Sequence, residues 1–271
     1  MNAYLGIDVG SVSTNIAVLD EAGEVHGTIY MRTQGRPVEA VQQGLRQIAR
    51  EHPQMAVRGV GVTGSGRQLT GAVIGGDCIK NEITAHAVAA MHIAPEVQTI
   101  IEMGGQDSKI IMLRNGIVTD FAMNTVCAAG TGSFLDQQSS RLSIPIEQFG
   151  DIALKSRSPV RIAGRCAVFA ESDMIHKQQT GHSISDILHG LCQALVRNYL
   201  SNLAKGKQVK APVLFQGGVA ANKGMRRAFE EALQTTVIIP PYFDVMGAIG
   251  AALLAREEMK NQRTSLFRGF E

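Results

Sequence analysis

Two cysteines have the most distinctive chemical setting in this sequence, because each stands just ahead of a segment with a helical pattern. Cys127 lies in NTVCAAGTGSFLDQQSSRL, where a glycine-rich turn leads into GSFLDQQSSRL, and Cys166 precedes VFAESDMIHK. Free N–H groups and the helix dipole at a helix N-terminus stabilise anions, including thiolates. Packing, nucleophilic chemistry and metal ligation are each consistent with a cysteine at these positions. Other motifs in the sequence are needed to choose among these three roles.

Two carboxylates end apolar strand patterns and are each followed closely by glycine. The segment Ile7-Asp8-Val9-Gly10 matches Ile101-Glu102-Met103-Gly104, and each belongs to a longer stretch (residues 4–20 and 99–123) that reads strand, glycine turn, strand. Glycine at such a turn lets backbone N–H groups approach a ligand and tolerates tight hairpin geometry. The internal repeat predicts two similar α/β halves that face each other across a cleft.

The elements around the repeat complete this α/β organisation. Apolar periodicity predicts helices over 37–51 and 81–92, with a strand over 57–63 between them. Further along, it predicts a long helix capped by Ser185, a strand in PVLFQ and a small-residue helix in MGAIGAALLAREEM. We expect a first half over residues 1–96 and a second over 97–271, with the C-terminal helix 246–260 able to join the first half.

Three glycine turns offer what nucleotide phosphates need, namely N–H donors and oxygen ligands for a divalent cation. In the first turn, Asp8 could reach a Mg²⁺-bound water. The residues of this turn that offer backbone and hydroxyl donors are Gly10, Ser11, Val12, Ser13 and Thr14. The second has Gly104, Gly105 and Gln106, flanked by the acidic Glu102 and Asp107. The third, GGVAANKG, suits the α-phosphate, ribose or adenine. No P-loop and no Rossmann fingerprint after a strand is present, so those two readings fail.

Composition excludes several other classes of function. The 271 residues carry a formal net charge of +2 without a Lys/Arg run, so binding to nucleic acid or to a membrane surface has no electrostatic support. No apolar run approaches the roughly 18–20 residues that would span a bilayer. The four cysteines are unclustered and no export signal precedes the first strand, which predicts reduced thiols in a cytoplasmic protein.

The motifs resemble those of known ATPases. LGIDVGSVST, IIEMGGQDSK and LFQGGVAAN resemble the two phosphate motifs and the adenosine motif of the actin, heat-shock chaperone and sugar kinase superfamily. Within it, VCAAGTGSFLDQQ and GRCAVFAESDMIHKQQTG resemble the ATP-dependent activators of 2-hydroxyacyl-CoA dehydratases, the ATPase subunits of benzoyl-CoA reductase and the reductases of double-cubane cluster proteins. The resemblance covers residues 3–256 and implies a duplicated actin-like, ribonuclease H-like fold.

The resemblance also implies a nucleotide site that holds ATP or ADP with Mg²⁺. The residues that match its motifs are Asp8, Gly10, Ser11, Val12, Ser13, Thr14, Gly104, Gly105, Gln106, Thr131, Gly132, Gly217, Gly218, Asn222 and Tyr242. Hydrolysis would use a water held by Glu102, Gln106 or Asp107, which the sequence does not rank. Tyr242 suits either the adenine or packing, and Lys109 either a phosphate or a solvated strand position.

In the similar families each subunit gives two cysteines to one [4Fe–4S] cluster shared across a homodimer, and Cys127 and Cys166 are the matching residues. A cubane cluster needs four thiolates. Two subunits related by a two-fold axis would supply them, two from each subunit. The resemblance implies an ATP-hydrolysing electron donor that receives electrons from ferredoxin or flavodoxin. It would pass them to an iron-sulfur dehydratase or reductase or to a double-cubane cluster protein. Cys78 and Cys192 match no ligand motif and are expected to be structural.

Some residues depart from the dehydratase activators. Asn-Thr-Val-Cys replaces Asn-Asp-Lys-Cys, residues 83–86 read Ile-Thr-Ala-His where those activators have Ser-Cys-His, and Arg165-Cys166 replaces Thr-Cys. These differences favour the branch typified by double-cubane reductases and large fused activases, and they leave the substrate open. The histidines, His86 and His189 among them, show no metal-ligand spacing and are expected at the surface or at helix caps. Two alternatives are a sugar or N-acetylhexosamine kinase of the same fold and a non-catalytic nucleotide sensor.

Overall fold

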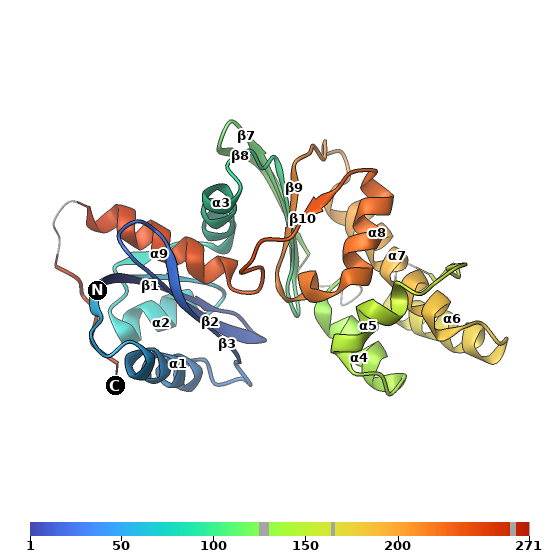
Figure 1. Ribbon diagram of the computed structural model, residues 1–271, viewed down its shortest axis with the longest axis horizontal. Helices are drawn as coiled ribbons and strands as arrows, with labels where there is room; N and C mark the ends of the chain where they lie inside the picture. Colours follow the sequence, from blue (N-terminus) through green and yellow to red (C-terminus); the bar gives the residue numbers. More distant parts are fainter. Residues whose placement is uncertain (125–129, 164–165, 261–263, 271) are drawn as a thin grey trace. The chain divides into compact units, whose positions relative to one another are not determined.

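A computed structural model describes residues 1–124, 130–163, 166–260 and 264–270 (Figure 1). Within these residues the strands form two five-stranded sheets. The chain divides into two compact units: unit 1 comprises Met1–Pro95 with Asp244–Glu271, and unit 2 comprises Glu96–Phe243. The C-terminal segment therefore completes the unit that the N-terminal segment begins.

The sheet of unit 1 combines an antiparallel meander with parallel strands, in the order β3-β2-β1-β4-β5. Strand β1 pairs antiparallel with β2 and parallel with β4. Its strands are β1 (Asn2–Val9), β2 (Ser13–Leu19), β3 (Val25–Arg32), β4 (Ala56–Thr63) and β5 (Cys78–Ile79). Buried residues at alternate and consecutive positions of β1 and β2 show that the central strands are covered on both faces.

Helices pack on both faces of this sheet (Figure 1); they are α1 (Pro37–Glu51), α2 (Arg67–Ile74), α3 (Glu82–Ile93) and α9 (Met246–Met259). Glycines bring α9 into backbone contact with its neighbours. A Cβ on Gly6 or Gly61 would lie 1.8 or 1.9 Å from a carbonyl oxygen of α9, and a Cβ on Gly250 would lie 1.8 Å from the carbonyl oxygen of Ala85 in α3. Any side chain at these positions would push α9 away from the sheet or from α3.

The C-terminal tail returns to the edge of the same sheet. Asp77, just before β5, accepts hydrogen bonds from Ser265 Oγ at 2.6 Å and from the Leu266 N–H at 2.7 Å. Phe267 and Phe270 then pack edge to face, with ring centroids 5.1 Å apart, against the core of unit 1. The tail therefore ties the end of the chain to the unit in which α9 lies.

The sheet of unit 2 has the order β10-β9-β6-β7-β8, which read from β8 repeats the strand order and directions of unit 1. Its strands are β6 (Thr99–Met103), β7 (Ser108–Arg114), β8 (Ile117–Asn124), β9 (Val213–Gln216) and β10 (Val237–Ile238). Asp8 pairs with Thr63 of β4 as Glu102 pairs with Gln216 of β9. This equivalence confirms the duplication predicted from the sequence.

The helices of unit 2 surround a core that includes the apolar face of α7. They are α4 (Gly132–Arg141), α5 (Ile146–Ala153), α6 (Ala167–Gln179), α7 (Ile184–Leu203) and α8 (Lys223–Leu233), with a 3-10 turn over Gly218–Ala221. The cap predicted for α7 is wrong by two residues. Ser183 is the N-cap, because its Oγ accepts from the Asp186 N–H at 3.2 Å and donates to the Asp186 carboxylate at 2.7 Å, whereas Ser185 lies inside the helix.

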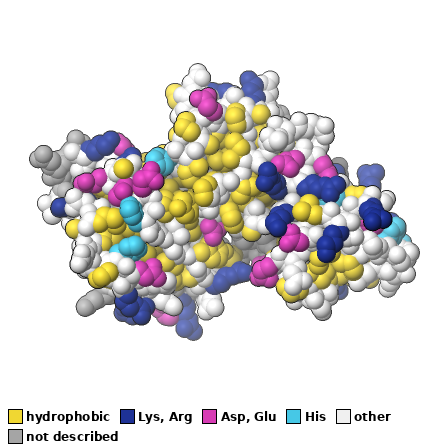
Figure 2. Space-filling model, in the orientation of Figure 1, with side chains coloured by type: hydrophobic (Ala, Val, Ile, Leu, Met, Phe, Trp, Pro, Cys, Tyr) yellow, Lys and Arg dark blue, Asp and Glu magenta, His cyan; other side chains and the backbone are white. Residues whose placement is uncertain are grey.

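The surface carries charges of both signs. On the face that Figure 2 shows, Lys and Arg side chains are interspersed with Asp and Glu side chains in each unit, in keeping with the net charge of +2. No helix in the part of the chain that the structure describes combines the length and apolarity needed to span a bilayer.

Candidate functional site

The first glycine turn joins β1 to β2 and is held by a residue that sequence analysis missed. The Gly10 N–H donates to the carbonyl of Ser13 at 2.9 Å, which closes the turn. Thr33, just after β3, donates from its N–H to Val12 O and from its hydroxyl to Gly10 O, both at 2.9 Å, and its hydroxyl lies 3.0 Å from that of Thr14. The turn is therefore pre-organised by β3, with Ser11 exposed at its tip.

Asp8 is partly buried at the end of β1, between two glycines from distant parts of the chain. A Cβ on Gly64 would lie 2.6 Å from Asp8 Oδ1, and a Cβ on Gly247 would lie 2.1 Å from Asp8 Oδ2. Gly64 belongs to the turn after β4 and Gly247 to the first turn of α9. Neither glycine follows a motif in the sequence, because their role depends on contacts that only the fold creates.

The second glycine turn contains a buried ion-pair network. Lys109, the first residue after Ser108 in β7, is 2% exposed, and its Nζ lies 3.0 Å from Glu102 Oε2 and 2.9 Å from Asp107 Oδ2. The Tyr199 hydroxyl donates to the Lys109 carbonyl at 2.5 Å. The solvated position considered for Lys109 is therefore wrong. A buried ammonium needs anionic partners, and Glu102 and Asp107 provide them.

Helix α4 begins directly on this turn. The N–H of Gly132 donates to the Gly104 carbonyl at 2.9 Å, and that of Ser133 donates to the Gly105 carbonyl at 2.8 Å. The Ser133 hydroxyl donates to the same Gly105 carbonyl at 2.5 Å. A Cβ on Gly132 would lie only 3.1 Å from the Gly104 oxygen, so glycine permits this approach. Thr131, the N-cap residue, is fully buried. The turn and the start of α4 thus form one hydrogen-bonded piece.

The third glycine turn lies against the second at Glu102. Gly217 has φ 89°, and a Cβ there would lie 2.4 Å from the Met103 carbonyl oxygen and 2.7 Å from Glu102 Oε1. The Gly217 N–H donates to the Phe243 carbonyl at 2.7 Å, and Gly218 opens the 3-10 turn that follows. Within unit 2, therefore, the second and third turns approach one buried carboxylate, and α4 begins on the second turn.

The remaining predicted contact residues of unit 2 differ in their surroundings. Asn222 caps α8, because its Oδ1 accepts from the Met225 N–H at 3.1 Å, while its Nδ2 has no hydrogen-bond partner among the described residues. Gln106 is exposed at the tip of the second turn, and Tyr242 is partly buried. The nucleotide roles assigned to these residues stay predictions.

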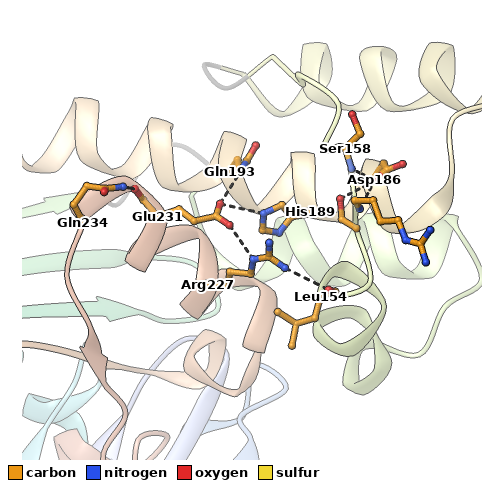
Figure 3. A network of polar contacts seen from close by, with 10 residues as sticks. Leu154, Ser158, Asp186, His189, Gln193, Arg227, Glu231 and Gln234 are labelled. Atoms are coloured by element: carbon orange, nitrogen blue, oxygen red, sulfur yellow. Dashed lines mark hydrogen bonds and ion pairs between the residues drawn. The ribbon is translucent and has the colours of Figure 1, made fainter.

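A polar network holds α8, the helix that follows the third turn, against α7 and α5 (Figure 3). Glu231 lies 3.1 Å from His189 Nε2 and accepts hydrogen bonds from Gln193 at 3.0 Å and Arg227 at 2.8 Å. Arg227 also donates to the carbonyl of Leu154 at 3.3 Å. Burial alone would raise the pKa of Glu231, but the hydrogen bonds from Gln193 and Arg227 and the nearby His189 bring it below its usual value.

The expectation that the histidines lie at the surface is wrong for two of them. His189 is fully buried between α7 and α8, and His86 in α3 is 6% exposed. Both lie on helices whose faces are covered by other elements, so their place depends on packing that a spacing pattern does not reveal.

The cysteines differ in burial. Cys127 lies outside the described residues. Cys166 is partly buried and is the N-cap residue of α6. Cys78 and Cys192 are buried, and desolvation raises the pKa of both thiols, as expected of structural residues. The described residues contain no group of three or more His, Cys, Asp or Glu side chains placed to hold a metal ion.

Comparison with known proteins adds the family. The model of the BadF/BadG/BcrA/BcrD ATPase family matches residues 5–255. The chain belongs to this ATPase family. A family relative in Acidaminococcus fermentans, the (R)-2-hydroxyglutaryl-CoA dehydratase activating ATPase, is 35% identical over 94% of this chain and 98% of its own. Membership confirms the resemblance drawn from the cysteine motifs.

Solved structures of this ATPase family confirm the actin-like fold. The activator of the 2-hydroxyisocaproyl-CoA dehydratase from Clostridium difficile, solved with bound ADPNP, has a TM-score of 0.85 at 32% identity, covering 96% of each chain. Component A of the (R)-2-hydroxyglutaryl-CoA dehydratase from Acidaminococcus fermentans has a TM-score of 0.88 at 32% identity, covering 95% of this chain and 99% of its own.

Proposed function

We propose that this ATPase is an electron donor that couples ATP hydrolysis to low-potential electron transfer. It would act as a homodimer with one [4Fe–4S] cluster between its subunits. Its electron acceptor would be a partner metalloenzyme, either an iron-sulfur dehydratase or reductase or a double-cubane cluster protein. Ferredoxin or flavodoxin would act upstream and supply electrons to this ATPase. The observation that carries the proposal is the start of α4, which follows Cys127 in the sequence and is hydrogen-bonded to a predicted phosphate turn.

ATP with Mg²⁺ would be bound through the three glycine turns and Asp8. In unit 1 the turn fixed by Thr33 would offer its N–H groups to the phosphates, and Asp8 would bind a water of the Mg²⁺ ion. In unit 2 the Gly104–Gly105 turn would hold phosphate, and the Gly217–Gly218 turn with Asn222 would contact the adenosine. The related activator solved with ADPNP supports nucleotide binding by this fold.

The geometry supports Gln106 among the three candidates for positioning the hydrolytic water. Glu102 and Asp107 each accept from the Lys109 ammonium, at 3.0 and 2.9 Å, which occupies one oxygen of each carboxylate. Gln106 lies between them in the sequence, exposed at the tip of the turn. Its amide would orient a water toward the terminal phosphate by accepting and donating hydrogen bonds.

Cys127 and Cys166 of each subunit would hold the cluster. Cys166 fits this role because it is partly buried at the N-terminus of α6, whose free N–H groups favour an anionic group. The cluster, when bound, supplies the transferable electron. The chain itself would supply four thiolates in the dimer and the N-terminus of α6 from each subunit.

ATP would act by favouring one conformation of the dimer, since a ligand that binds two states equally shifts neither. The Gly104 and Gly105 carbonyls accept from the first N–H groups of α4. A displacement of this turn by the nucleotide would therefore carry the start of α4 with it. This connects nucleotide state to the segment that contains Cys127.

The proposal is tested by measuring iron and acid-labile sulfide in protein purified without oxygen. About four of each per dimer, with a visible band that dithionite bleaches, would support the shared cluster. Cys127→Ala and Cys166→Ala should abolish iron binding and leave ADP binding nearly unchanged. Cys78→Ala, a matched control at a buried thiol outside the cysteine motifs, should retain iron.

Colourless protein that takes up no cluster on reconstitution would overturn the electron-donor proposal and leave the kinase as the working hypothesis. Equal loss of iron and of ADP binding in the Cys127→Ala and Cys166→Ala variants would instead assign the two thiols a structural role.

A further inference from the structure

Asp8 shares its place against helix α9 with a second polar side chain, that of His86. An ideal Cβ placed on Gly247 would lie 2.1 Å from Asp8 Oδ2 and 3.3 Å from His86 Cε1. Both side chains therefore border the space beside Gly247 in the first turn of α9. Cε1 is the ring carbon between the two nitrogens, so the imidazole presents its polar edge there.

The packing of helix α3 against helix α9 fixes the position of His86. It lies in α3 and is 6% exposed, and the residue before it, Ala85, packs its backbone against Gly250 of α9. Gly247 lies one turn earlier in α9. Because a backbone-to-backbone contact fixes α3 against α9 at this point, the ring has little freedom to move away from Asp8.

We propose that His86 is a positioning residue for Asp8: its ring donates a hydrogen bond to the Asp8 carboxylate and holds the rotamer that meets a Mg²⁺-bound water. The inference rests on the proposed nucleotide site. A buried imidazole must satisfy its N–H, and a carboxylate that contacts a metal shell is itself usually held by a hydrogen bond. His86 does not touch the nucleotide or the metal; it acts through Asp8.

Another histidine of the same helix provides a control. His92 lies 3.2 Å from the carbonyl oxygen of Gly23, in the turn between β2 and β3, and it is exposed. His189 provides a second control, because it is fully buried and paired with Glu231, but it belongs to unit 2. The His92 variant thus controls for the loss of a histidine from α3, and the His189 variant controls for the loss of a buried histidine. Neither variant changes the hydrogen bond proposed between His86 and Asp8.

The experiment measures, by calorimetry, how strongly Mg²⁺ enhances ADP binding, with the Mg²⁺ dependence of ATP hydrolysis as a second readout. His86→Ala should weaken the Mg²⁺ enhancement about 10-fold, the loss typical for a residue that supports a metal ligand. His86→Gln, which retains an N–H donor, should recover part of it. His92→Gln should behave as wild type, and His189→Gln should lower the melting temperature without changing the Mg²⁺ dependence.

A double-mutant cycle then asks whether His86 acts through Asp8. In an Asp8→Asn background, His86→Ala should have no further effect on Mg²⁺ dependence, because its target is already lost. Additive effects, or a His86→Ala variant with wild-type Mg²⁺ dependence, would overturn the inference. The His86→Gln variant keeps the test valid if His86→Ala does not fold.

Failure of the proposed function gives a different pattern. Wild-type protein that shows the expected Mg²⁺ effects but binds no iron contradicts the electron-donor proposal and supports the role of His86. Wild-type protein whose ADP affinity is unaffected by Mg²⁺ overturns both the Mg²⁺ site proposed at Asp8 and the inference.

Discussion

At the scale of single residues, Lys109 distinguishes the second glycine turn from the first. Its equivalent in unit 1, by strand register, is Asn15, which pairs with Asp8 as Lys109 pairs with Glu102. Asn15 is neutral, whereas Lys109 brings a positive charge into the protein beside two carboxylates. The duplicated framework therefore has a lysine at this register position in one copy and a neutral asparagine in the other.

Lys109→Met should destabilise the protein strongly, because Glu102 would remain buried without its cation. Breaking a buried ion pair from one side typically costs about 3–5 kcal/mol, whereas replacing both members is far less costly. The free energy of unfolding, measured with denaturant, should therefore fall in Lys109→Met and recover partly in Lys109→Met/Glu102→Gln. A single variant as stable as wild type would mean that Glu102 is solvated or paired elsewhere.

At the scale of elements, the loop between α5 and α6 is fastened to α7 by Asp186 (Figure 3). The Asp186 carboxylate accepts from the Ser183 hydroxyl at 2.7 Å, from the Ser156 hydroxyl at 2.7 Å and from the Ser158 N–H at 3.0 Å. The Ser183 hydroxyl, the Ser158 N–H and the Ser156 hydroxyl hold the pKa of Asp186 well below its usual value.

This lowered pKa predicts an acid-sensitive contribution to stability. A carboxylate whose pKa is lower in the folded state stabilises the protein above its unfolded pKa of about 3.9, and this contribution is lost as the pH falls toward the folded value. Asp186→Asn should therefore lower the melting temperature at pH 7, and the gap to wild type should shrink below about pH 4. Melting curves across this range test it; a gap independent of pH would assign the effect to packing.

Elements with a strong local signal could be predicted from the sequence, and the others could not. Helix α1 has the predicted bounds because Pro37 suits a helix start and its apolar face repeats at helical spacing. Helix α9 also matches MGAIGAALLAREEM. Helices α2 and α5 and strand β5 were missed, because eight-residue helices and a two-residue strand depend on neighbouring elements for their stability.

The candidate site divides in the same way. The glycine turns and the carboxylates at strand ends follow each other closely in the chain, so their pattern is readable from the sequence. Thr33, Gly64, Gly247 and His86 approach Asp8 or its turn only through strand pairing and helix packing. Their identity as supporting residues depends on contacts between distant segments, which a single sequence does not encode in any local pattern.

At the scale of the whole molecule, residues proposed to contact the nucleotide occur in each of the two units. Binding of MgADP should therefore slow backbone hydrogen exchange in two separate places, residues 8–14 of unit 1 and residues 102–107 with 217–222 of unit 2. The tail over residues 264–270 provides an internal control that should not change. Mass spectrometry of peptic fragments resolves these segments. Protection confined to one unit would contradict the nucleotide contacts proposed for the other.

The return of the chain to unit 1 has a consequence for its synthesis. Strands β1 to β5 leave the ribosome early, but the helix that packs against Gly6 and Gly61 is α9, near the end of the chain. Unit 2 has its full set of elements once Phe243 has emerged. Domains generally fold as units during translation, in order from the N-terminus. Here unit 1 begins first but is completed last. Its apolar strands therefore lack the covering helix α9 while unit 2 is being synthesised.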